Sequence, residues 1–206
     1  KAPAVFDYKK LEWYNGQYIR MLSDEELYKR VLPFITGTGD AALEVVTENP
    51  QPMPNVGPDF SGVALGEDGE PYCVDTSMGM TGEDVKKALM SLMPLIKERL
   101  KYLADAAEMV HFLFTEPDVP AKENIIPKKL DEAKTREVLE KAKDFVSVVF
   151  EKGHDAAEEY AKQTSEAMGI KLGDFMMPIR MAVTGSRVSP PLIGSILILG
   201  KEKALS

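Results

Sequence analysis

The sequence has few of the residues that build covalent or metal-centred frameworks. Its 206 residues include one cysteine, Cys73, and two histidines, His111 and His154. A single cysteine excludes an internal disulfide framework and is typical of a reducing compartment, so we expect a cytoplasmic protein. A zinc site would need ligands from these three distant positions, which is an unusual arrangement. His111, inside an apolar helical stretch, is interpreted as a satisfied core residue, and His154 as a residue at a helix end.

Long apolar runs and catalytic signatures are missing as well. No apolar run approaches the ~20 residues that span a bilayer, which argues against a membrane protein. The motifs HExxH, CxxC, GxxxxGKS and GxSxG are absent, so the sequence has no metallohydrolase, dithiol, phosphate-binding or nucleophile-elbow signature. The carboxylates that are present are interpreted as solvated helix-face residues paired with lysine. We predict no catalytic residue, cofactor or metal within this segment.

Basic residues are also in the minority. The sequence has 25 Lys and Arg against 33 Asp and Glu, for a net charge of −8. This balance argues against nucleic-acid binding through positive charge over the whole surface, so any such binding needs a local basic patch. The chain starts at Lys1 with neither an initiator methionine nor a long apolar leader, and we expect an excised piece of a longer protein.

Apolar residues at three- and four-residue steps run through most of the chain and predict an all-helical fold. Ser23 and Glu26 have the spacing of a capping box, and Thr81 or Gly82 can open a helix in which Pro94 causes a kink or a restart. Asp7, Thr135 and Asp155 are each predicted to cap the start of a helix, and Gly153 and Gly169 are predicted to end helices. A further short helix is predicted over 41–46. A second proline, Pro178, is expected to interrupt a later helix. The first helix is expected to carry Leu11, Tyr14, Tyr18, Ile19 and Leu22.

One segment, residues 49–82, is dense in proline, glycine and acidic residues and opposes a continuous helix. Within it, two short apolar runs flank Gly66–Gly69 and predict a small β-hairpin near 60–76. A hairpin alone is marginally stable, so it either packs on the helices or leaves the segment without fixed structure. The proline-rich run 115–120 predicts a boundary between two helical subdomains, 1–118 and 119–206.

The C-terminal stretch 184–200 combines a turn with an apolar helix. Ser189 is predicted as the N-cap and Pro190 as the first helical residue, because proline there loses an amide hydrogen that lacks a partner anyway. Gly200 is predicted to end the helix in a left-handed conformation. By itself this pattern is typical of an ordinary capped helix, although a rigid helix start also offers fixed donors and acceptors to a polar ligand.

Motifs at both ends of the chain resemble the C-terminal, anticodon-binding region of bacterial-type glutamyl-tRNA synthetases, which are class I aminoacyl-tRNA synthetases. They are KLEWYNGQYI at 10–19, HFLFT at 111–115, PIRMAVTGS at 178–186, SPPL at 189–192 and LGKE at 199–202. The resemblance covers about two-thirds of the chain and leaves out residues 40–80. It implies two helical subdomains, sometimes called a helical cage, rather than the β-barrels of glutaminyl-tRNA synthetases.

The resemblance also implies a function in translation. The parent enzyme would ligate glutamate to tRNA(Glu), with ATP and Mg used by an upstream catalytic domain of the same chain, and this segment would read the anticodon loop. The protein is expected to act as a monomer.

Residue by residue, the resemblance places base-reading contacts at two positions. Arg99 matches the arginine that contacts the third anticodon base and favours the cytosine of tRNA(Glu) over the guanine of tRNA(Gln). Ser189, Pro190 and Leu192 match the loop and helix start that contact the first two anticodon bases, where some family members have threonine in place of the serine. The two positions together predict a composite base-reading surface.

Other matched residues are expected to support this surface. Trp13 and Asn15 match a motif at the junction with the preceding domain, although Trp13 is equally well explained as a core residue. Arg180 and Gly185 are expected to serve structure. Local positive charge is predicted to gather near the loop from Lys97, Arg99, Lys101, Arg180 and Arg187. The alternative function is a free-standing helical protein-interaction module, for which apolar helices and an acidic surface suffice.

Overall fold

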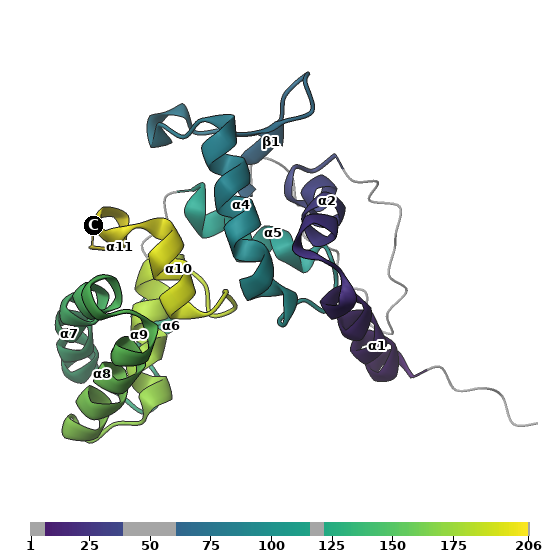
Figure 1. Ribbon diagram of the computed structural model, residues 1–206. Helices are drawn as coiled ribbons and strands as arrows, with labels where there is room; N and C mark the ends of the chain where they lie inside the picture. Colours follow the sequence, from purple (N-terminus) through teal and green to yellow (C-terminus); the bar gives the residue numbers. More distant parts are fainter. Residues whose placement is uncertain (1–6, 39–60, 116–121, 206) are drawn as a thin grey trace, which may run out of the picture. The chain divides into compact units, whose positions relative to one another are not determined.

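The computed structural model describes residues 7–38, 61–115 and 122–205 (Figure 1). The chain divides into two compact units, Lys1–Thr115 and Glu116–Ser206, which are called unit 1 and unit 2 below. The boundary predicted between 118 and 119 and the short helix predicted over 41–46 lie outside the described residues.

Unit 1 is mainly helical. Helices α2 and α4 pack on each other and on α5, and the aliphatic side chains between them are fully buried. The elements of unit 1 are α1 (Tyr8–Met21), α2 (Asp24–Ile35), β1 (Val63–Leu65), β2 (Pro71–Cys73), the 3-10 turn η1 (Thr76–Met78), α4 (Gly82–Lys97), α5 (Asp105–Val110) and the 3-10 turn η2 (His111–Leu113).

Local capping chemistry sets the helix starts of unit 1. The Asp7 side chain accepts a hydrogen bond from the Lys10 amide and caps α1. Reciprocal capping boxes open α2, at Ser23 and Glu26, and α4, at Thr81 and Asp84, so these predicted starts are confirmed. Pro94 lies inside α4, and the predicted restart there is wrong. Its exposed ring faces away from the core, and the buried side chains on either side keep the helix continuous.

The predicted β-hairpin is confirmed. Strands β1 and β2 pair antiparallel, with Val63 opposite Cys73 and Leu65 opposite Pro71. The hairpin packs on α4, and the buried Cys73 thiol lies 3.7 Å from the carbonyl oxygen of Phe114. Packing against the helices therefore supplies the stability that a lone hairpin lacks.

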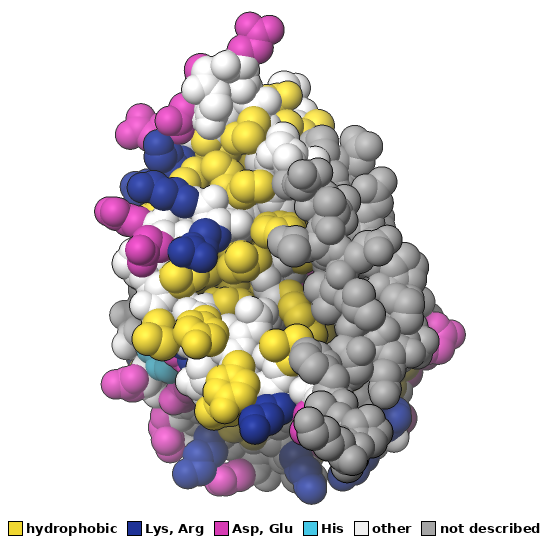
Figure 2. All heavy atoms as spheres, turned by 90° about the vertical axis from the view of Figure 1, so that its right-hand side faces the viewer, with side chains coloured by type: hydrophobic (Ala, Val, Ile, Leu, Met, Phe, Trp, Pro, Cys, Tyr) yellow, Lys and Arg dark blue, Asp and Glu magenta, His cyan; other side chains and the backbone are white. Residues whose placement is uncertain are grey.

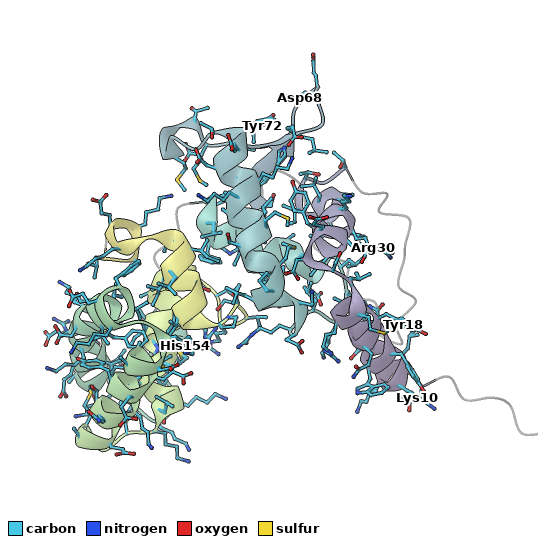
Figure 3. The ribbon with its side chains drawn as sticks, viewed as in Figure 1. Lys10, Tyr18, Arg30, Asp68, Tyr72 and His154 are labelled. Atoms are coloured by element: carbon cyan, nitrogen blue, oxygen red, sulfur yellow. The ribbon has the colours of Figure 1, made fainter. Side chains whose placement is uncertain are left out.

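Helix α1 differs from the other helices because much of its apolar surface is exposed. Ile19 is buried, whereas Tyr18 is 67% exposed and Met21 is 79% exposed. Figure 3 shows Tyr18 and Lys10 projecting from α1, and Figure 2 shows hydrophobic side chains gathered on the face that carries α1 and α2. Periodic spacing thus predicted the helix correctly but not which of its faces is covered.

The capping boxes make unit 1 sensitive to acid. Hydrogen bonds from Ser23 lower the pKa of the Glu26 carboxyl from its ordinary value, and hydrogen bonds from Thr81 do the same for the pKa of the Asp84 carboxyl. A carboxyl with a lowered folded-state pKa stabilises the fold above its unfolded pKa, and this stability is lost as the pH falls through the folded value. The melting temperature of the double variant Glu26→Gln, Asp84→Asn should therefore fall less between pH 5 and pH 3 than that of the wild type. The explanation would be contradicted if the melting temperature of the double variant fell as steeply as that of the wild type. It would also be contradicted if the control variant Glu25→Gln showed the same smaller fall.

Unit 2 is helical throughout its described residues. Its elements are α6 (Lys122–Ile125), α7 (Glu132–Lys152), α8 (His154–Ala167), α9 (Leu172–Thr184), α10 (Leu192–Leu199) and α11 (Lys201–Leu205). One core joins α7, α8, α9 and α10, and Phe145 and Phe175 meet edge to face at its centre, 6.3 Å apart.

Several helix boundaries of unit 2 differ from those predicted. Asp131, not Thr135, caps α7, and Thr135 is a buried residue whose hydroxyl donates to the Asp131 carbonyl. Gly153 precedes α8, so Asp155 lies in its first turn instead of capping it. Helix α9 runs through Pro178 without interruption. Gly200 does end α10, but with φ 89° and ψ 155° its conformation is not the left-handed helical one.

Candidate functional site

The C-terminal turn between α9 and α10 is held by Arg180. The Arg180 Nη1 donates to the Ser189 hydroxyl at 2.6 Å, to the Pro190 carbonyl at 2.9 Å and to the Ser189 carbonyl at 3.3 Å. Gly185 ends α9 with a left-handed φ of 66°, and its amide donates to the Met181 carbonyl. The guanidinium therefore fixes one end of the turn, and the glycine turns the chain at the other.

The helix start predicted at Ser189 and Pro190 is wrong by two residues. Helix α10 begins at Leu192, Pro191 is its N-cap residue, and no side chain caps it. The Ser189 hydroxyl is buried, accepts from Arg180 and donates to the Pro190 carbonyl at 3.3 Å, and it does not cap α10. Capping patterns in sequence do not reveal such partners of a hydroxyl.

Burial divides the residues of this turn into two groups. Ser189, Pro190 and Leu192 are buried, whereas Arg187 and Val188 are exposed. The Arg187 Nη2 donates to two carbonyl oxygens at the α6 helix, those of Glu123 and Asn124, at 3.4 Å each. Arg187 and Val188 therefore form the accessible side of the turn.

The second candidate position, Arg99, lies in the turn that follows α4. Its amide donates to the Ile96 carbonyl at 2.8 Å, and its side chain is exposed. Within the described part of the chain, the guanidinium makes no hydrogen bond or ion pair, so it is available to a ligand. Arg99 belongs to unit 1 and the turn of Ser189 to unit 2, so the composite surface that combines them stays a prediction.

Helix α1 braces the turn that carries Arg99. The Asn15 amide donates to the Lys101 carbonyl, and Lys101 forms an ion pair with Glu12 at 3.5 Å. Arg20 lies 3.9 Å from Glu98 on the other side of Arg99. Residues on both sides of Arg99 are thus tied to α1, which restricts the backbone from which its side chain extends.

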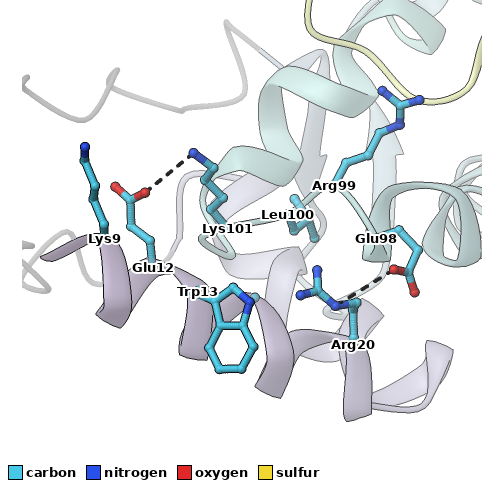
Figure 4. A pocket seen from close by; sticks show the side chains of 9 residues that line it. Lys9, Glu12, Trp13, Arg20, Glu98, Arg99, Leu100 and Lys101 are labelled. Carbon is cyan, nitrogen blue, oxygen red and sulfur yellow. Dashed lines mark ion pairs between the residues drawn. The ribbon is translucent and has the colours of Figure 1, made fainter. Parts of the chain in front are cut away.

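An open pocket of about 300 Å³ lies between α1 and this turn (Figure 4). Trp13 lines it and is 57% exposed, so the interpretation of Trp13 as a core residue is wrong. Nine residues line the pocket: Lys9, Glu12, Trp13, Gly16, Arg20, Glu98, Arg99, Leu100 and Lys101.

Sequence reasoning identified Arg99 and Trp13 but missed that they line one pocket, and it missed Lys9 and Arg20 altogether. A signal was present, because residues 9, 13, 16 and 20 recur at three- and four-residue steps and share one face of α1. At Gly16 in this row the Leu100 carbonyl lies close to α1: a Cβ added there would lie 3.6 Å from its oxygen, an ordinary van der Waals distance, so the contact does not require glycine.

The predicted gathering of five cations is only partly available for binding. Lys97 forms an ion pair with Asp24, Lys101 pairs with Glu12, and Arg180 donates to the C-terminal turn. Arg99 and Arg187 are exposed, one in each unit.

The described residues hold neither a metal-binding cluster nor a membrane-spanning helix. Among the described residues, no group of three or more His, Cys, Asp or Glu side chains is placed to hold a metal ion. No helix in the described ranges is long and apolar enough to cross a membrane. His111 is half-buried and its Nδ1 lies 3.2 Å from the Thr115 hydroxyl, and His154 is the first residue of α8.

Comparison with known proteins gives consistent results. A family model described as an anticodon binding domain matches residues 26–206. Proteins named glutamate–tRNA ligase are similar over nearly the whole chain. One from Treponema denticola is 47% identical over 205 residues, which cover all of this chain and 37% of the relative. One from a Roseiflexus species is 31% identical over 204 residues, which cover 99% of this chain and 33% of the relative. The similarity thus extends beyond the two-thirds that the motifs covered, and the chain spans about a third of the length of these relatives.

Solved structures match the fold. A crystal structure of a glutamate tRNA ligase from Elizabethkingia meningosepticum, in complex with its amino acid, aligns with a TM-score of 0.55 and 17% identity over all of this chain and 32% of the other. A glutamate–tRNA synthetase from Elizabethkingia anophelis aligns with a TM-score of 0.50 and 18% identity over 99% of this chain and 31% of the other. The predicted all-helical class with a small hairpin is confirmed.

Proposed function

Because this chain belongs to the family of anticodon-binding domains, we propose that it recognises the anticodon loop of tRNA(Glu) as one part of a glutamate–tRNA ligase. The observation that carries the proposal is Arg99, an exposed guanidinium on a turn that α1 braces on both sides. An anticodon loop is single-stranded, so its bases can be splayed out and read on their Watson–Crick edges by groups held in fixed positions.

Arg99 is proposed to favour cytosine over guanine at the third anticodon position. A guanidinium has only donors, and cytosine offers it acceptors on a small ring. The larger guanine would have to displace a side chain whose backbone is tied to α1 through the hydrogen bond from the Asn15 amide to the Lys101 carbonyl. Size and hydrogen bonding therefore act in the same direction.

The C-terminal turn is proposed to meet the first two anticodon bases. The side chains of Ser189, Pro190 and Leu192 are buried. These residues would therefore contribute to base contacts through the shape and the backbone groups of the turn. The direct side-chain contacts then come from the accessible side, Arg187 and Val188. Arg180, Gly185 and Asn15 act as positioning residues.

The remaining parts of the proposal concern the longer protein. Glutamate would be activated with ATP and Mg in a catalytic domain outside this segment, and this segment would itself bind neither. The protein would act as a monomer in the cytoplasm. Its binding energy for the correct anticodon would gate aminoacylation carried out elsewhere in the enzyme.

Gel-shift binding of short RNA hairpins tests the proposal directly. The 206-residue chain should bind a hairpin with the anticodon stem and loop of tRNA(Glu) at least about tenfold more tightly than the same stem with a scrambled loop, since base contacts of this kind are each worth ~1–3 kcal/mol. Equal binding of both hairpins would contradict anticodon reading. Binding of neither would favour the protein-interaction module.

Reversing the charge of Arg187 separates backbone contacts from base contacts. Arg187→Glu should weaken binding of the tRNA(Glu) hairpin roughly five- to tenfold and lower the slope of log Kd against log salt by about 1, because one phosphate contact is lost. Arg136→Glu is the matched control, since Arg136 lies on exposed α7 surface with 75% of its side chain accessible. Unchanged affinity and slope for Arg187→Glu would count against a role for this side of the turn.

A further inference from the structure

The exposure of Trp13 is unusual for so large an apolar side chain. The indole is 57% exposed although α1 contacts the turn of Arg99 through neighbouring positions. Its ring meets that of Tyr14 edge to face at 5.0 Å and 73°, a contact that orients the indole. Trp13 is therefore a large aromatic surface, held in place and open to solvent at a pocket.

Cations surround this aromatic surface. The pocket is lined by Lys9, Arg20, Arg99 and Lys101 against two carboxylates, Glu12 and Glu98, in a chain with a net charge of −8. The two ion pairs across the pocket are long, 3.9 Å for Arg20 and 3.5 Å for Lys101. Exposed pairs of this kind contribute little stability, so a phosphate can recruit either cation at small cost.

The size of the pocket matches a small planar ligand. At about 300 Å³ and open to solvent, it lies at the lower end of the ~300–1,000 Å³ range of ligand pockets. Single-stranded RNA is bound by this combination of an aromatic stacking platform and cations that follow the backbone. A protein partner fits less well, because an apolar interface depletes charged residues at its centre.

We propose that this pocket holds one unstacked nucleotide of the bound tRNA, with its base stacked on Trp13 and its phosphate facing Arg20 and Lys101. The inference rests on the proposed function. In Figure 4 the Arg99 side chain extends away from α1, whereas Trp13 lies on α1. The nucleotide on Trp13 is therefore a neighbour of the base that Arg99 reads, and not the same base.

The test uses the fact that Trp13 is the sole tryptophan of the chain. Its fluorescence reports on this pocket alone, and stacking of a base quenches it. Titration with the tRNA(Glu) anticodon hairpin should quench the emission, with free N-acetyltryptophanamide correcting for absorption by the RNA. Trp13→Ala should weaken hairpin binding about five- to twentyfold. This is the lower part of the range for base stacking, because the pocket is open to solvent. Trp13→Phe should keep most of the affinity, since it keeps an aromatic ring.

Matched variants separate stacking from other effects. Tyr18→Ala removes an aromatic side chain that is 67% exposed on the same helix, and Tyr72→Ala removes one that is 46% exposed on β2. Both should bind the hairpin as the wild type does. Far-ultraviolet circular dichroism and melting temperature should be unchanged in Trp13→Ala, since most of the indole is already solvated.

The outcomes distinguish this inference from the proposed function. If the wild type binds the hairpin without quenching, and Trp13→Ala binds it equally well, the pocket is not a nucleotide site although anticodon recognition stands. That result is also the one expected if Trp13 instead contacts another part of a longer protein at a domain junction. If the wild type does not bind the hairpin, both the proposed function and this inference fall.

Discussion

Replacing Arg180 by alanine should lower the free energy of unfolding of unit 2 by about 2–4 kcal/mol, since hydrogen bonds from a charged group each contribute ~1.5–3 kcal/mol. The guanidinium donates to Ser189 twice and to Pro190 once. Without it, the Ser189 hydroxyl and the Ser189 carbonyl oxygen lose their donor at a buried place, and the Pro190 carbonyl keeps only the donor of the Ser189 hydroxyl at 3.3 Å. The turn between α9 and α10 should then lose its fixed conformation.

The same change should act on RNA binding. Because Arg187 and Val188 extend from the turn that Arg180 holds, Arg180→Ala should also weaken binding of the tRNA(Glu) hairpin under conditions where the chain is still folded. Urea unfolding followed by circular dichroism measures the stability, and gel shifts below the unfolding transition measure the affinity.

Two variants control for charge and for the loss of an arginine in general. Arg180→Lys keeps the charge, but its side chain is shorter and its ammonium does not reach the position of Nη1, so it should recover only part of the stability. Arg136→Ala, on the exposed face of α7, should change stability by less than ~0.5 kcal/mol. If Arg180→Ala were no more destabilising than Arg136→Ala, the turn would not depend on the guanidinium.

Replacing Arg99 by glutamine should abolish most of the preference for cytosine over guanine at the third anticodon position. We expect the ratio of the two affinities to change about ten- to a hundredfold, since a specific base contact is worth ~1–3 kcal/mol. Stability should be unaffected because the Arg99 side chain is exposed and makes no hydrogen bond or ion pair with the described residues. The measurement is the Kd of two hairpins that differ only at that base.

The expected change is a gain of guanine binding relative to cytosine in Arg99→Gln. Glutamine is shorter and has both a donor and an acceptor, so it leaves room for guanine and can match both the donors and the acceptor of its Watson–Crick edge. Arg30→Gln on α2, another exposed arginine of unit 1, is the matched control and should leave the preference intact. The same preference in wild type and Arg99→Gln would remove Arg99 from base selection.

The sequence predicted best the features that depend on a few neighbouring residues. The capping boxes of Ser23 and Thr81 satisfy amides three residues away, so their spacing is sufficient to place α2 and α4. The hairpin around Gly66–Gly69 follows from the same local logic. Predictions failed where distant groups compete, as at Ser189, whose hydroxyl serves Arg180 instead of α10.

The sequence by itself determined the helical class, the capped helix starts at Asp7, Ser23 and Thr81, and the identity of Arg99 and Trp13 as residues of interest. Only the tertiary structure decided which side chains are accessible. Apolar periodicity identifies a face but not whether anything covers it, and so the exposure of Trp13 could not be predicted. Likewise the pocket depends on Asn15 reaching the carbonyl of Lys101, far along the chain, and contacts at such separation are fixed by packing rather than by local sequence.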